Sequence, residues 1–579
     1  MFDSDLKFHN HRNPIGDFFI TQNINKDAES KFFESGAVRY FINGWYIYTW
    51  NIPIRKDNIS FTGFGVIDGR FIIGPKLLSH AYNLTSGTYC LINIKDESNI
   101  IVTPDNMGMY QLFYSSSLVT NRLHLAKIYT QSVEQDLIYS NFLLDNMLFQ
   151  QWSLFDTPVS GTKILPALSD IQLSASGTVI VNSQDVFEGE LSPFEYKRLI
   201  QEGAEEIKKD IVAITNSGLP VMADISGGKD SRVVFSALKS TNNINNVFFN
   251  TRFNGRNHKD LEIAPALVEV YGGSYESQLE VKDFVHFDYS YMVNQRRSQL
   301  FGMCHDFDLG QFRTSQESYT KPFIRLLGGC GELYRNYYQD LFNFTKKELD
   351  SNDFSLIEEK MYGFESSCVQ ISKLKDYLVG KHVQTFKKLS SYNLEQSLDN
   401  HYLNFRNRFH FGLRTTEKEG VINISPAANI KILKASRGLP QNEKDSGRVL
   451  FDLMYALDNR LPFYNYDSYW DISFVNSEYS IKKIENPELI SLVANTGFYD
   501  KFNRNQRHVG NAKDFKMKNN KTDKQISVDL LEFSIKKLKG SERGWFLDQD
   551  FIEKMYFYSE SKPLRFNTWV SRLVATYDF

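Results

Sequence analysis

The residues best suited to chemistry stand together in one short stretch, Ser226-Gly-Gly-Lys-Asp-Ser231. Residues 220–225 before it form an apolar run with a single acid, which predicts a buried parallel strand, and residues 232–238 after it predict a helix. Gly227 and Gly228 let the backbone turn sharply and approach a ligand closely. A glycine-rich turn that feeds a helix N-terminus binds anions, because unpaired N–H groups and the helix dipole point at the same spot. The stretch therefore predicts a phosphate site.

The spacing of this stretch is not that of a Walker A loop, which needs Gly-x4-Gly-Lys-Ser/Thr. It resembles the pyrophosphate loop of the ATP pyrophosphatase superfamily, whose members split ATP between its α and β phosphates and leave AMP on an oxygen of the substrate. The resemblance implies that the N–H groups of Gly227 to Ser231, with the Ser226 and Ser231 hydroxyls, hold the pyrophosphate. Asp230 would contact it through Mg²⁺, because two anions need a cation between them. The alternative is an ordinary strand–turn–helix whose glycines only permit tight packing.

Composition and charge narrow the classes of function. The 579 residues carry a formal net charge of −3 with acids and bases mixed, so the chain offers no basic stripe for nucleic acid or an anionic membrane surface. Its length predicts two or more domains, and its 42% hydrophobic residues suffice for real cores. No run reaches transmembrane length, and no signal-peptide segment is visible. Four scattered cysteines without metal spacing predict a cytoplasmic protein with reduced thiols.

The first part of the chain, to about residue 195, reads as rich in β-strands. Short apolar or alternating runs separated by turn residues predict strands at 41–50, 59–67, 87–96, 99–108 and 112–115. A turn is predicted at 105–108 inside the fourth run, and a hairpin joins 170–174 to 178–181.

The order of these runs resembles the glutaminase-type N-terminal nucleophile (Ntn) domain of asparagine synthetases. That family has a Gly-x-aromatic strand, a strand ending in Asp-x-x-Gly, a Leu-aromatic-Tyr strand, and a Leu-Pro stretch before a strand that ends at Gly. The matching residues are Asp105, Gly108, Leu112, Phe113, Tyr114, Leu165, Pro166 and Gly177. The resemblance implies an αββα domain over residues 1–195.

One departure from that family bears on the reaction. The glutaminase domain uses a cysteine directly after the initiator Met, and its free amine helps activate the thiol. Phe2 stands there in this chain, and the first cysteine is Cys90, inside a predicted strand. We therefore expect no glutamine hydrolysis and a domain kept as a scaffold or docking surface. Cys90 is expected to be a small buried hydrophobic residue and not a replacement nucleophile.

The segment after the phosphate loop predicts a second strand and helix. Residues 246–251 read as the next parallel strand, and in the synthetases the equivalent strand lies beside adenine, which makes Phe249 and Asn250 the expected adenosine neighbours. Asp260 begins the following helix and fits a helix cap better than a ligand. A further helix is predicted around 283–300. Cys304-His-Asp-Phe-Asp308 could form a metal cluster, but a polar loop is favoured because no second ligand group is visible.

A second glycine-rich turn follows an apolar run at 323–327. The run leads into Gly328-Gly-Cys-Gly331 and then Glu332, which is predicted to start a helix. The synthetases have Gly-Glu-Gly-x-Asp-Glu here, with acids that handle Mg-pyrophosphate and the acyl-adenylate. By resemblance, Gly328 and Gly329 are assigned to cofactor binding, and Glu332 to the remaining catalytic and metal-binding carboxylate. Cys330 is assigned no role.

Residues 340–579 are predicted to be mostly helical. The segment 403–414 carries a set of basic residues, Arg406, Arg408, His410 and Arg414, for which a solvated helix face is favoured over phosphate neutralisation. Residues 420–429 resemble the synthetase segment Glu-x-Arg-x-Pro-Phe-Leu-Asp, with Pro426 kept and Asn429 in place of the acid. The family also has a C-terminal lysine that steadies the transition state as the amine attacks. The loop with Lys513, Lys516 and Lys518 is the best candidate, and Lys518 is assigned this role.

Together these features predict an α/β chain in two domains, an Ntn-type αββα glutaminase-like domain at 1–195 and a pyrophosphate-loop synthetase domain at 196–579 with a parallel sheet flanked by helices. The implied reaction is ATP- and Mg²⁺-dependent amide formation through an acyl-adenylate, with release of AMP and pyrophosphate. The amine would not be glutamine-derived ammonia, as in β-lactam synthetases, carbapenam synthetases and lasso-peptide cyclases. The expected substrate is a small molecule or peptide of specialised-metabolite, peptide or surface-sugar biosynthesis.

Three other functions stay open from the sequence. The first is a nucleotide-binding sensor or assembly protein without turnover. The second is a glutamine- or ammonia-dependent amidotransferase. The third, transfer of sulfur or nitrogen to RNA, is disfavoured by the near-neutral charge. A homodimer and a partner biosynthetic protein are both compatible with the sequence.

Overall fold

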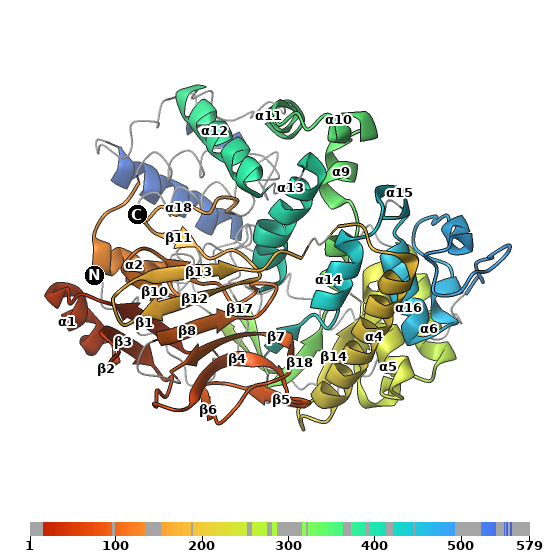
Figure 1. Ribbon diagram of the computed structural model, residues 1–579, viewed down its shortest axis with the longest axis horizontal. Helices are drawn as coiled ribbons and strands as arrows, with labels where there is room; N and C mark the ends of the chain where they lie inside the picture. The colour runs from red at the N-terminus through yellow and green to blue at the C-terminus, as the bar shows by residue number, and fades with distance from the viewer. Residues whose placement is uncertain are drawn as a thin grey trace.

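The structure, a computed structural model, describes most of the chain. The described residues are 15–94, 99–134, 152–186, 189–251, 258–274, 281–286, 315–319, 322–362, 372–389, 393–412, 421–444, 446–492 and 523–539, with a few isolated positions beyond 548. They form a mixed α/β architecture that combines two antiparallel sheets, a parallel sheet and many helices (Figure 1).

Two antiparallel sheets make up the first part of the chain. The strands of the first sheet, in spatial order, are β11 (Lys163–Ile164), β9 (Phe113–Tyr114), β10 (Leu118–Thr120), β1 (Asp17–Thr21), β3 (Trp45–Trp50) and β2 (Val38–Ile42). The second sheet runs β13 (Val179–Ser183), β12 (Ser169–Ser174), β8 (Asn99–Pro104), β7 (Leu84–Asn93), β4 (Ile59–Ile67) and β5 (Arg70–Ile73), and β6 (Lys76–Leu78) also pairs with β4.

The two antiparallel sheets pack face to face because their side chains alternate. Phe18 and Ile20 of β1 share a core with Ile171 and Leu173 of β12, and all four are fully buried. Phe19 points to the opposite face of its sheet, since successive strand residues alternate, and its ring lies 5.2 Å from that of Phe32 in α1 (Lys26–Glu34). The long helix α4 (Pro193–Thr215) contacts β4, β5 and β7 of the second sheet. The layers therefore run helix, sheet, sheet, helix.

The predicted single strand at 41–50 is two strands. β2 and β3 form a hairpin whose two-residue loop is Asn43-Gly44, with φ of 53° and 81°. Two successive residues with positive φ are what a tight hairpin turn requires. The other strands expected in this part are found at nearly the predicted places, β7 beginning three residues earlier than predicted.

The parallel sheet carries the glycine-rich turns. Its order is β15 (Phe248–Asn250), β14 (Val221–Asp224), β18 (Phe323–Leu326) and β19 (Val421–Ile424), and every neighbouring pair is parallel. The chain leaves β14 through α5 (Lys229–Ser240) to β15 on one side, then returns to β18 on the other. In open parallel sheets the crevice at such a reversal, beyond the carboxyl ends of the strands, is the usual place for a ligand.

Helix α4 leads into this sheet and is well specified by its sequence. Ser192 and Glu195 form a capping box in which each side chain accepts from the other's backbone N–H, and Pro193 occupies the first helical position. Its buried side chains recur every three to four residues along the helix, from Tyr196 to Ile214.

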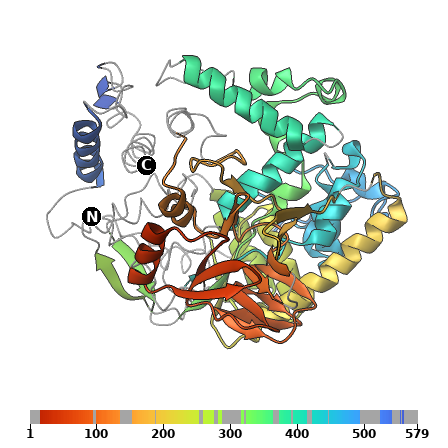
Figure 2. The ribbon, with the colours of Figure 1, turned by 60° about the vertical axis from the view of Figure 1, so that its left-hand side comes forward.

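The described residues beyond 330 are mostly helical, as predicted. Their helices include α9 (Tyr337–Phe342), α10 (Lys346–Asp350), α11 (Ser355–Tyr362), α12 (Ser372–Leu389), α13 (Leu394–His401), α14 (Ile430–Arg437), α15 (Gln441–Lys444), α16 (Arg448–Leu457) and α18 (Asp523–Leu538). In Figures 1 and 2, α12 lies along one edge of the molecule, away from the red and orange strands of the first part. The helix expected at 283–300 begins instead as strand β16 (Val281–His286), paired with β17 (Ser315–Tyr319); residues 287–314 lie outside the described part.

The basic segment after α13 does not form a solvated helix face. It is a π-helix, η4 (Tyr402–Gly412), and Arg406 and Arg408 are only 6% and 1% exposed. Arg408 donates to the backbone oxygens of Gly108 (2.6 Å) and Leu165 (2.7 Å), both in the antiparallel part of the chain. Arg408 therefore links the helical part of the chain to the antiparallel part through hydrogen bonds. Arg414 lies outside the described residues, as does the side chain of His410.

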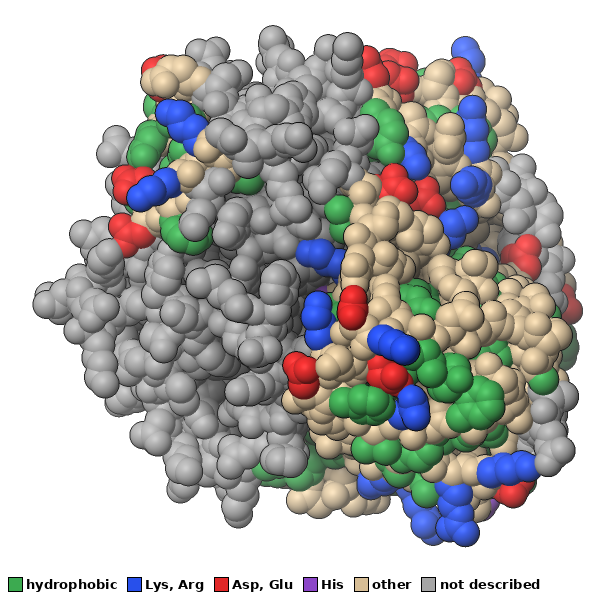
Figure 3. Space-filling view, turned by 90° about the vertical axis from the view of Figure 1, so that its left-hand side faces the viewer, with side chains coloured by type: hydrophobic (Ala, Val, Ile, Leu, Met, Phe, Trp, Pro, Cys, Tyr) green, Lys and Arg blue, Asp and Glu red, His purple; other side chains and the backbone are tan. Residues whose placement is uncertain are grey.

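Two further findings concern the surface. None of the described helices is long and apolar enough to cross a membrane. On the face in Figure 3, the described Lys and Arg side chains are interspersed with acidic and hydrophobic ones.

Candidate functional site

The two glycine-rich turns meet at the reversal point of the parallel sheet. Residues 226–228 follow β14 and residues 327–330 follow β18, and these strands are direct neighbours. A methyl group at Gly328 would lie 2.6 Å from both Cα and N of Ser231, so the two turns are in backbone-to-backbone contact. The structure thus brings together the two stretches that the sequence marked separately.

The first turn is held by its own side chains. Ser231 Oγ accepts from the N–H of Ser226 (3.0 Å), and Ser226 Oγ accepts from the N–H of Gly228 (3.1 Å). Both hydroxyls predicted to hold pyrophosphate are therefore already used to shape the turn. Gly228 is the N-cap of α5 and supplies no side-chain cap, so the first-turn N–H groups of that helix have no capping side chain.

Asp260 has a role that the sequence analysis did not favour. Asp260 lies in the first turn of α6 (His258–Val270), and its Oδ1 accepts from the N–H of Gly227 at 2.7 Å. A methyl group at Gly227 would lie 3.2 Å from the same oxygen. The Asp260 carboxylate therefore stabilises the glycine turn, whereas the sequence had suggested only a helix cap.

Asp230 and Glu332, the two predicted metal-binding carboxylates, both pair with Arg335. Arg335 Nη2 is 3.2 Å from Asp230 Oδ2 and 3.7 Å from Glu332 Oε1. The side chains are 25%, 21% and 31% exposed for Asp230, Glu332 and Arg335, so the group lies partly open to solvent. The second oxygens, Asp230 Oδ1 and Glu332 Oε2, are each buried and have no hydrogen-bond partner among the described residues.

The electrostatics of this group disfavour the charged form of Asp230. Burial raises the pKa of Asp230 well above its ordinary value, the nearby Glu332 raises it further, and Arg335 and Lys229 oppose the shift. Gly331 stands beside the carboxylate, where a methyl group would come within 2.0 Å of Asp230 Oδ1. A side chain at position 331 would therefore collide with Asp230.

A distant segment, 464–467, completes the surroundings of the turn. Arg232 of α5 is fully buried, lies over the ring of Tyr466 at 3.8 Å, and donates to the backbone oxygens of Tyr464 and Asn465, both at 2.7 Å. Asp467 donates its N–H to the Gly227 carbonyl at 3.1 Å. Its carboxylate lies beside Gly228, 3.8 Å from where a methyl group there would be. Sequence reasoning missed Asp467, because no motif or spacing links it to residues more than 200 positions away.

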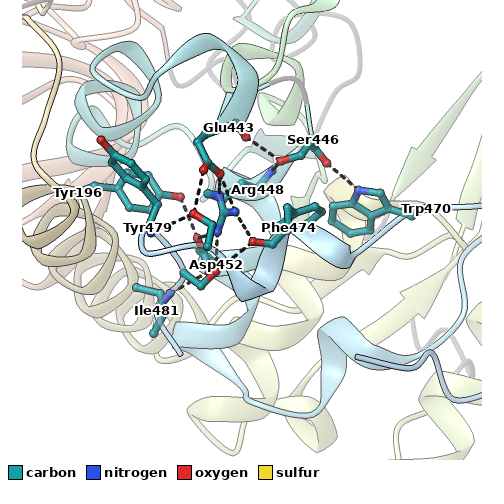
Figure 4. A network of polar contacts seen from close by, with 11 residues as sticks. Tyr196, Glu443, Ser446, Arg448, Asp452, Trp470, Phe474, Tyr479 and Ile481 are labelled. Carbon is teal, nitrogen blue, oxygen red and sulfur yellow. Dashed lines mark hydrogen bonds and ion pairs between the residues drawn. The ribbon is translucent and has the colours of Figure 1, made fainter. Parts of the chain in front are cut away.

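The next residues of that segment are positioned by the buried network in Figure 4. Arg448 donates to Glu443 (2.6 Å) and to the Phe474 carbonyl, and Asp452 accepts from Tyr196 (3.1 Å). Burial raises the pKa of Asp452 to about 6, and Arg448 opposes this.

Trp470 is tied to the same network. Its Nε1 donates to the Ser446 carbonyl at 2.9 Å. Lys229 Nζ lies 4.1 Å from the centre of the Trp470 ring. Burial, and then Arg335, lower the pKa of Lys229, while Asp230 and Asp467 act in the opposite direction. A lysine held over an aromatic ring at the start of α5 adds positive charge next to the uncapped helix end.

Close packing also explains the glycine at position 329 of the second turn. A methyl group at Gly329 would lie 2.4 Å from the ring of Phe411 on η4, so this position tolerates no side chain. Cys330 is fully buried with a φ of 73°, and burial raises the pKa of its thiol. Glu332 begins no α-helix; it lies in a short 3-10 turn, η3 (Gly331–Tyr334).

The two expected adenosine neighbours are separated by the pleat of β15. Phe249 is 3% exposed and its ring packs 5.3 Å from that of Phe235 in α5, so this side chain belongs to the core and not to a ligand site. Asn250 faces the neighbouring strand, where its Nδ2 is 3.4 Å from Asp224 Oδ1. Asp224 also pairs with Arg325 of β18 at 2.8 Å. The prediction for the Phe249 side chain is thus wrong, because alternation turns it away.

Some predicted residues lie outside the described part of the chain. These are Lys513, Lys516 and Lys518, and the Cys304-His-Asp-Phe-Asp308 cluster. Cys90 is described; it is fully buried in β7, and burial raises the pKa of its thiol well above the ordinary value. This confirms the buried hydrophobic role expected for Cys90.

The residues present fit a divalent cation only as a pair. No group of three or more His, Cys, Asp or Glu side chains that could hold a metal occurs among the described residues. Mg²⁺, however, is often held by one or two carboxylates, with waters and substrate phosphates supplying the other ligands. The unpaired buried oxygens of Asp230 and Glu332 are suited to that arrangement.

Comparison with known proteins adds no family to this picture. No model of a known protein family matches the chain, and no curated protein matches its sequence.

Proposed function

We propose that this protein binds ATP at the reversal point of its parallel sheet and uses it to form an amide through an acyl-adenylate, with release of AMP and pyrophosphate. The observation that carries the proposal is the contact between the two glycine-rich turns beside the uncapped start of α5. That place combines N–H groups with the positive end of a helix dipole, and Lys229 is the first residue of the helix, which together suit a pyrophosphate.

The proposal assigns each residue a task. The N–H groups at the start of α5 bind the phosphates, and Asp260 and Asp467 hold the glycine turn in shape from outside. Asp230 and Glu332 would hold Mg²⁺, which when bound neutralises phosphate charge. Lys518 is the proposed stabiliser of the transition state as the amine attacks.

The first 195 residues are proposed to be a glutaminase-like domain of the Ntn αββα type, with the synthetase domain over 196–579. The face-to-face antiparallel sheets support this, as does α1 on the outer face of the first sheet. The helix on the second sheet is α4, which lies almost entirely in the second proposed domain. Cys90 is too deeply buried to serve as a nucleophile. We therefore propose an amine other than glutamine-derived ammonia, carried by a substrate of specialised-metabolite, peptide or surface-sugar biosynthesis.

The test is ATP binding and AMP release in matched lysine variants. Lys229→Met removes the charge beside the proposed phosphate site and should weaken ATP binding about tenfold, since one cation at a helix N-terminus is being lost. Lys239→Met is the control, because Lys239 is on the same helix, at its other end, and also lies over an aromatic ring, that of Tyr271. Equal ATP affinity in the two variants, or no ATP binding by the unaltered protein, would refute the proposal.

A second candidate is nucleotide binding without turnover. Arg335 pairs with both carboxylates that the reaction would use for Mg²⁺. This pairing favours a protein that binds nucleotide without catalysing the reaction. Incubation with ATP, Mg²⁺ and a panel of carboxylic acids and amines separates the two functions: AMP release supports ligation, and tight ATP binding without AMP under any condition supports the second candidate.

A further inference from the structure

The geometry points to Arg335 as a resident cation that competes with a divalent metal ion for Asp230 and Glu332. The guanidinium lies 3.2 Å from one carboxylate and 3.7 Å from the other, each through the same nitrogen, Nη2. It thus stands at the place where a bridging ion between these two acids would be. The inference deepens the proposed function, but it concerns the protein and the metal alone.

Charge explains why a cation is needed there. Two carboxylates that share a partly desolvated site repel each other unless a positive group lies between them. Asp467 adds a third acid to the electrostatic environment of Asp230. Lys229 is directed to the Trp470 ring, so Arg335 is the basic group with a direct ion pair to these acids among the described residues.

The pairing by Arg335 is incomplete, which leaves room for exchange. Asp230 Oδ1, Glu332 Oε2 and Arg335 Nε are all buried without a hydrogen-bond partner in the described part of the chain. A buried unpaired polar atom costs free energy. A divalent ion in place of the guanidinium would take oxygen ligands from both carboxylates, including the two oxygens that the guanidinium leaves unpaired.

The guanidinium and the metal ion cannot both lie between the carboxylates, because like charges at such distances repel strongly. Binding of the metal therefore requires Arg335 to withdraw. The freed guanidinium is planar, always charged and suited to bidentate contact with phosphate. In the proposed reaction, Arg335 would then pass from the acids to the nucleotide when the metal arrives.

The experiment measures Mn²⁺ affinity of the full chain without nucleotide, by the loss of the free-ion electron paramagnetic resonance signal, together with melting temperature with and without Mg²⁺. Arg335→Gln should bind Mn²⁺ at least about tenfold more tightly than the unaltered protein. Its melting temperature should fall in EDTA and recover with Mg²⁺. The matched control is Arg325→Gln, since Arg325 pairs with Asp224 on the neighbouring strand of the same sheet and not with Asp230 or Glu332 in any described ion pair.

Each outcome decides the question. A gain of affinity in Arg335→Gln that disappears when Glu332→Gln is added supports the competition. The same affinity in Arg335→Gln as in the unaltered protein, or an equal gain in Arg325→Gln, overturns it. If Arg335→Gln fails to fold even with Mg²⁺, Arg335→Lys replaces it, because its ammonium keeps a charge for folding but ends a shorter side chain and therefore lies farther from the two acids; unchanged Mn²⁺ affinity in that variant also overturns the inference. Failure to bind ATP in any variant counts against the proposed function only.

Discussion

The contact between the two glycine turns leads to a sharp prediction for Gly328→Ala. The added methyl group would meet Cα and N of Ser231 at 2.6 Å and the carbonyl carbon of Asp230 at 3.0 Å. All three are backbone atoms, so no flexible side chain can swing aside. Gly328 has no positive φ, and the cost therefore comes from this contact and not from backbone strain.

The size of the effect follows from the overlap. Ordinary contacts of a methyl carbon lie at 3.4–4 Å, so the turns would have to separate by most of an ångström. Inserting a methyl group into packed structure costs about 1–3 kcal/mol. Reduced freedom of the unfolded chain returns about 0.4–1 kcal/mol. We expect a net loss of about 1–2 kcal/mol in the free energy of unfolding, and weaker pyrophosphate binding.

The assay is urea unfolding followed by circular dichroism, with calorimetric titration of pyrophosphate. Gly380→Ala is the matched control, because Gly380 lies inside α12 and a methyl group there would meet no atom within 4 Å. The control should gain about 0.5–1 kcal/mol, since alanine favours a helix over glycine. If Gly328→Ala were as stable as the unaltered protein, or shifted in the same direction as Gly380→Ala, the reasoning about the two turns would be refuted.

Three further predictions test the buried polar groups. Arg408→Met should lower the free energy of unfolding by about 2–4 kcal/mol in urea, because two buried carbonyls lose their donor; Arg408→Lys should recover only part of it, and full stability in the Met variant would contradict this role. His382 is fully buried, which lowers its pKa to about 3. The unfolded chain protonates this histidine near pH 6.5, whereas burial prevents protonation in the folded protein, so the free energy of unfolding falls as the pH drops from 6.5 toward 3, by about 1.4 kcal/mol per pH unit. Between pH 7 and 5, the free energy of unfolding of His382→Leu should therefore fall by about 2 kcal/mol less than that of the unaltered protein. An equal fall in both proteins would exclude His382 as the titrating group. In native protein, iodoacetamide should leave Cys90 and Cys330 unmodified in peptide mass spectra, since both thiols are buried; rapid labelling of Cys90 would reopen it as a nucleophile.

Local signals in the sequence predicted the elements of the site. The alternation of β12, the apolar run of β14 and the double glycine before α5 each depend on neighbouring residues, and all three elements are found. Asp105 and Gly108 were likewise placed in a turn, and the Asp105 carboxylate accepts from the N–H groups of Met109 and Tyr110 there. Such features are readable because backbone dihedral limits and side-chain period act over a few residues.

Errors arose where a long-range contact overrode a local preference. The sequence suggested that Arg406 and Arg408 are solvated, yet both are buried on η4, and Arg408 donates to carbonyls 243 and 300 positions earlier in the chain. Phe249 was assigned to a ligand by its place after the loop, but the choice between the two faces of a strand depends on what packs on each face.

The sequence by itself determined that a glycine-rich turn joins a buried strand to a helix, because that arrangement needs only local backbone geometry. The tertiary structure alone decided that the second turn contacts the first and that Asp260 and Asp467 form hydrogen bonds with Gly227 of the first turn. It also decided that Arg335 pairs with both Asp230 and Glu332. Apart from the local pair of Arg335 with Glu332, these contacts join residues from about 30 to 240 positions apart. Their geometry depends on strand order in the parallel sheet, which no short pattern of residues encodes.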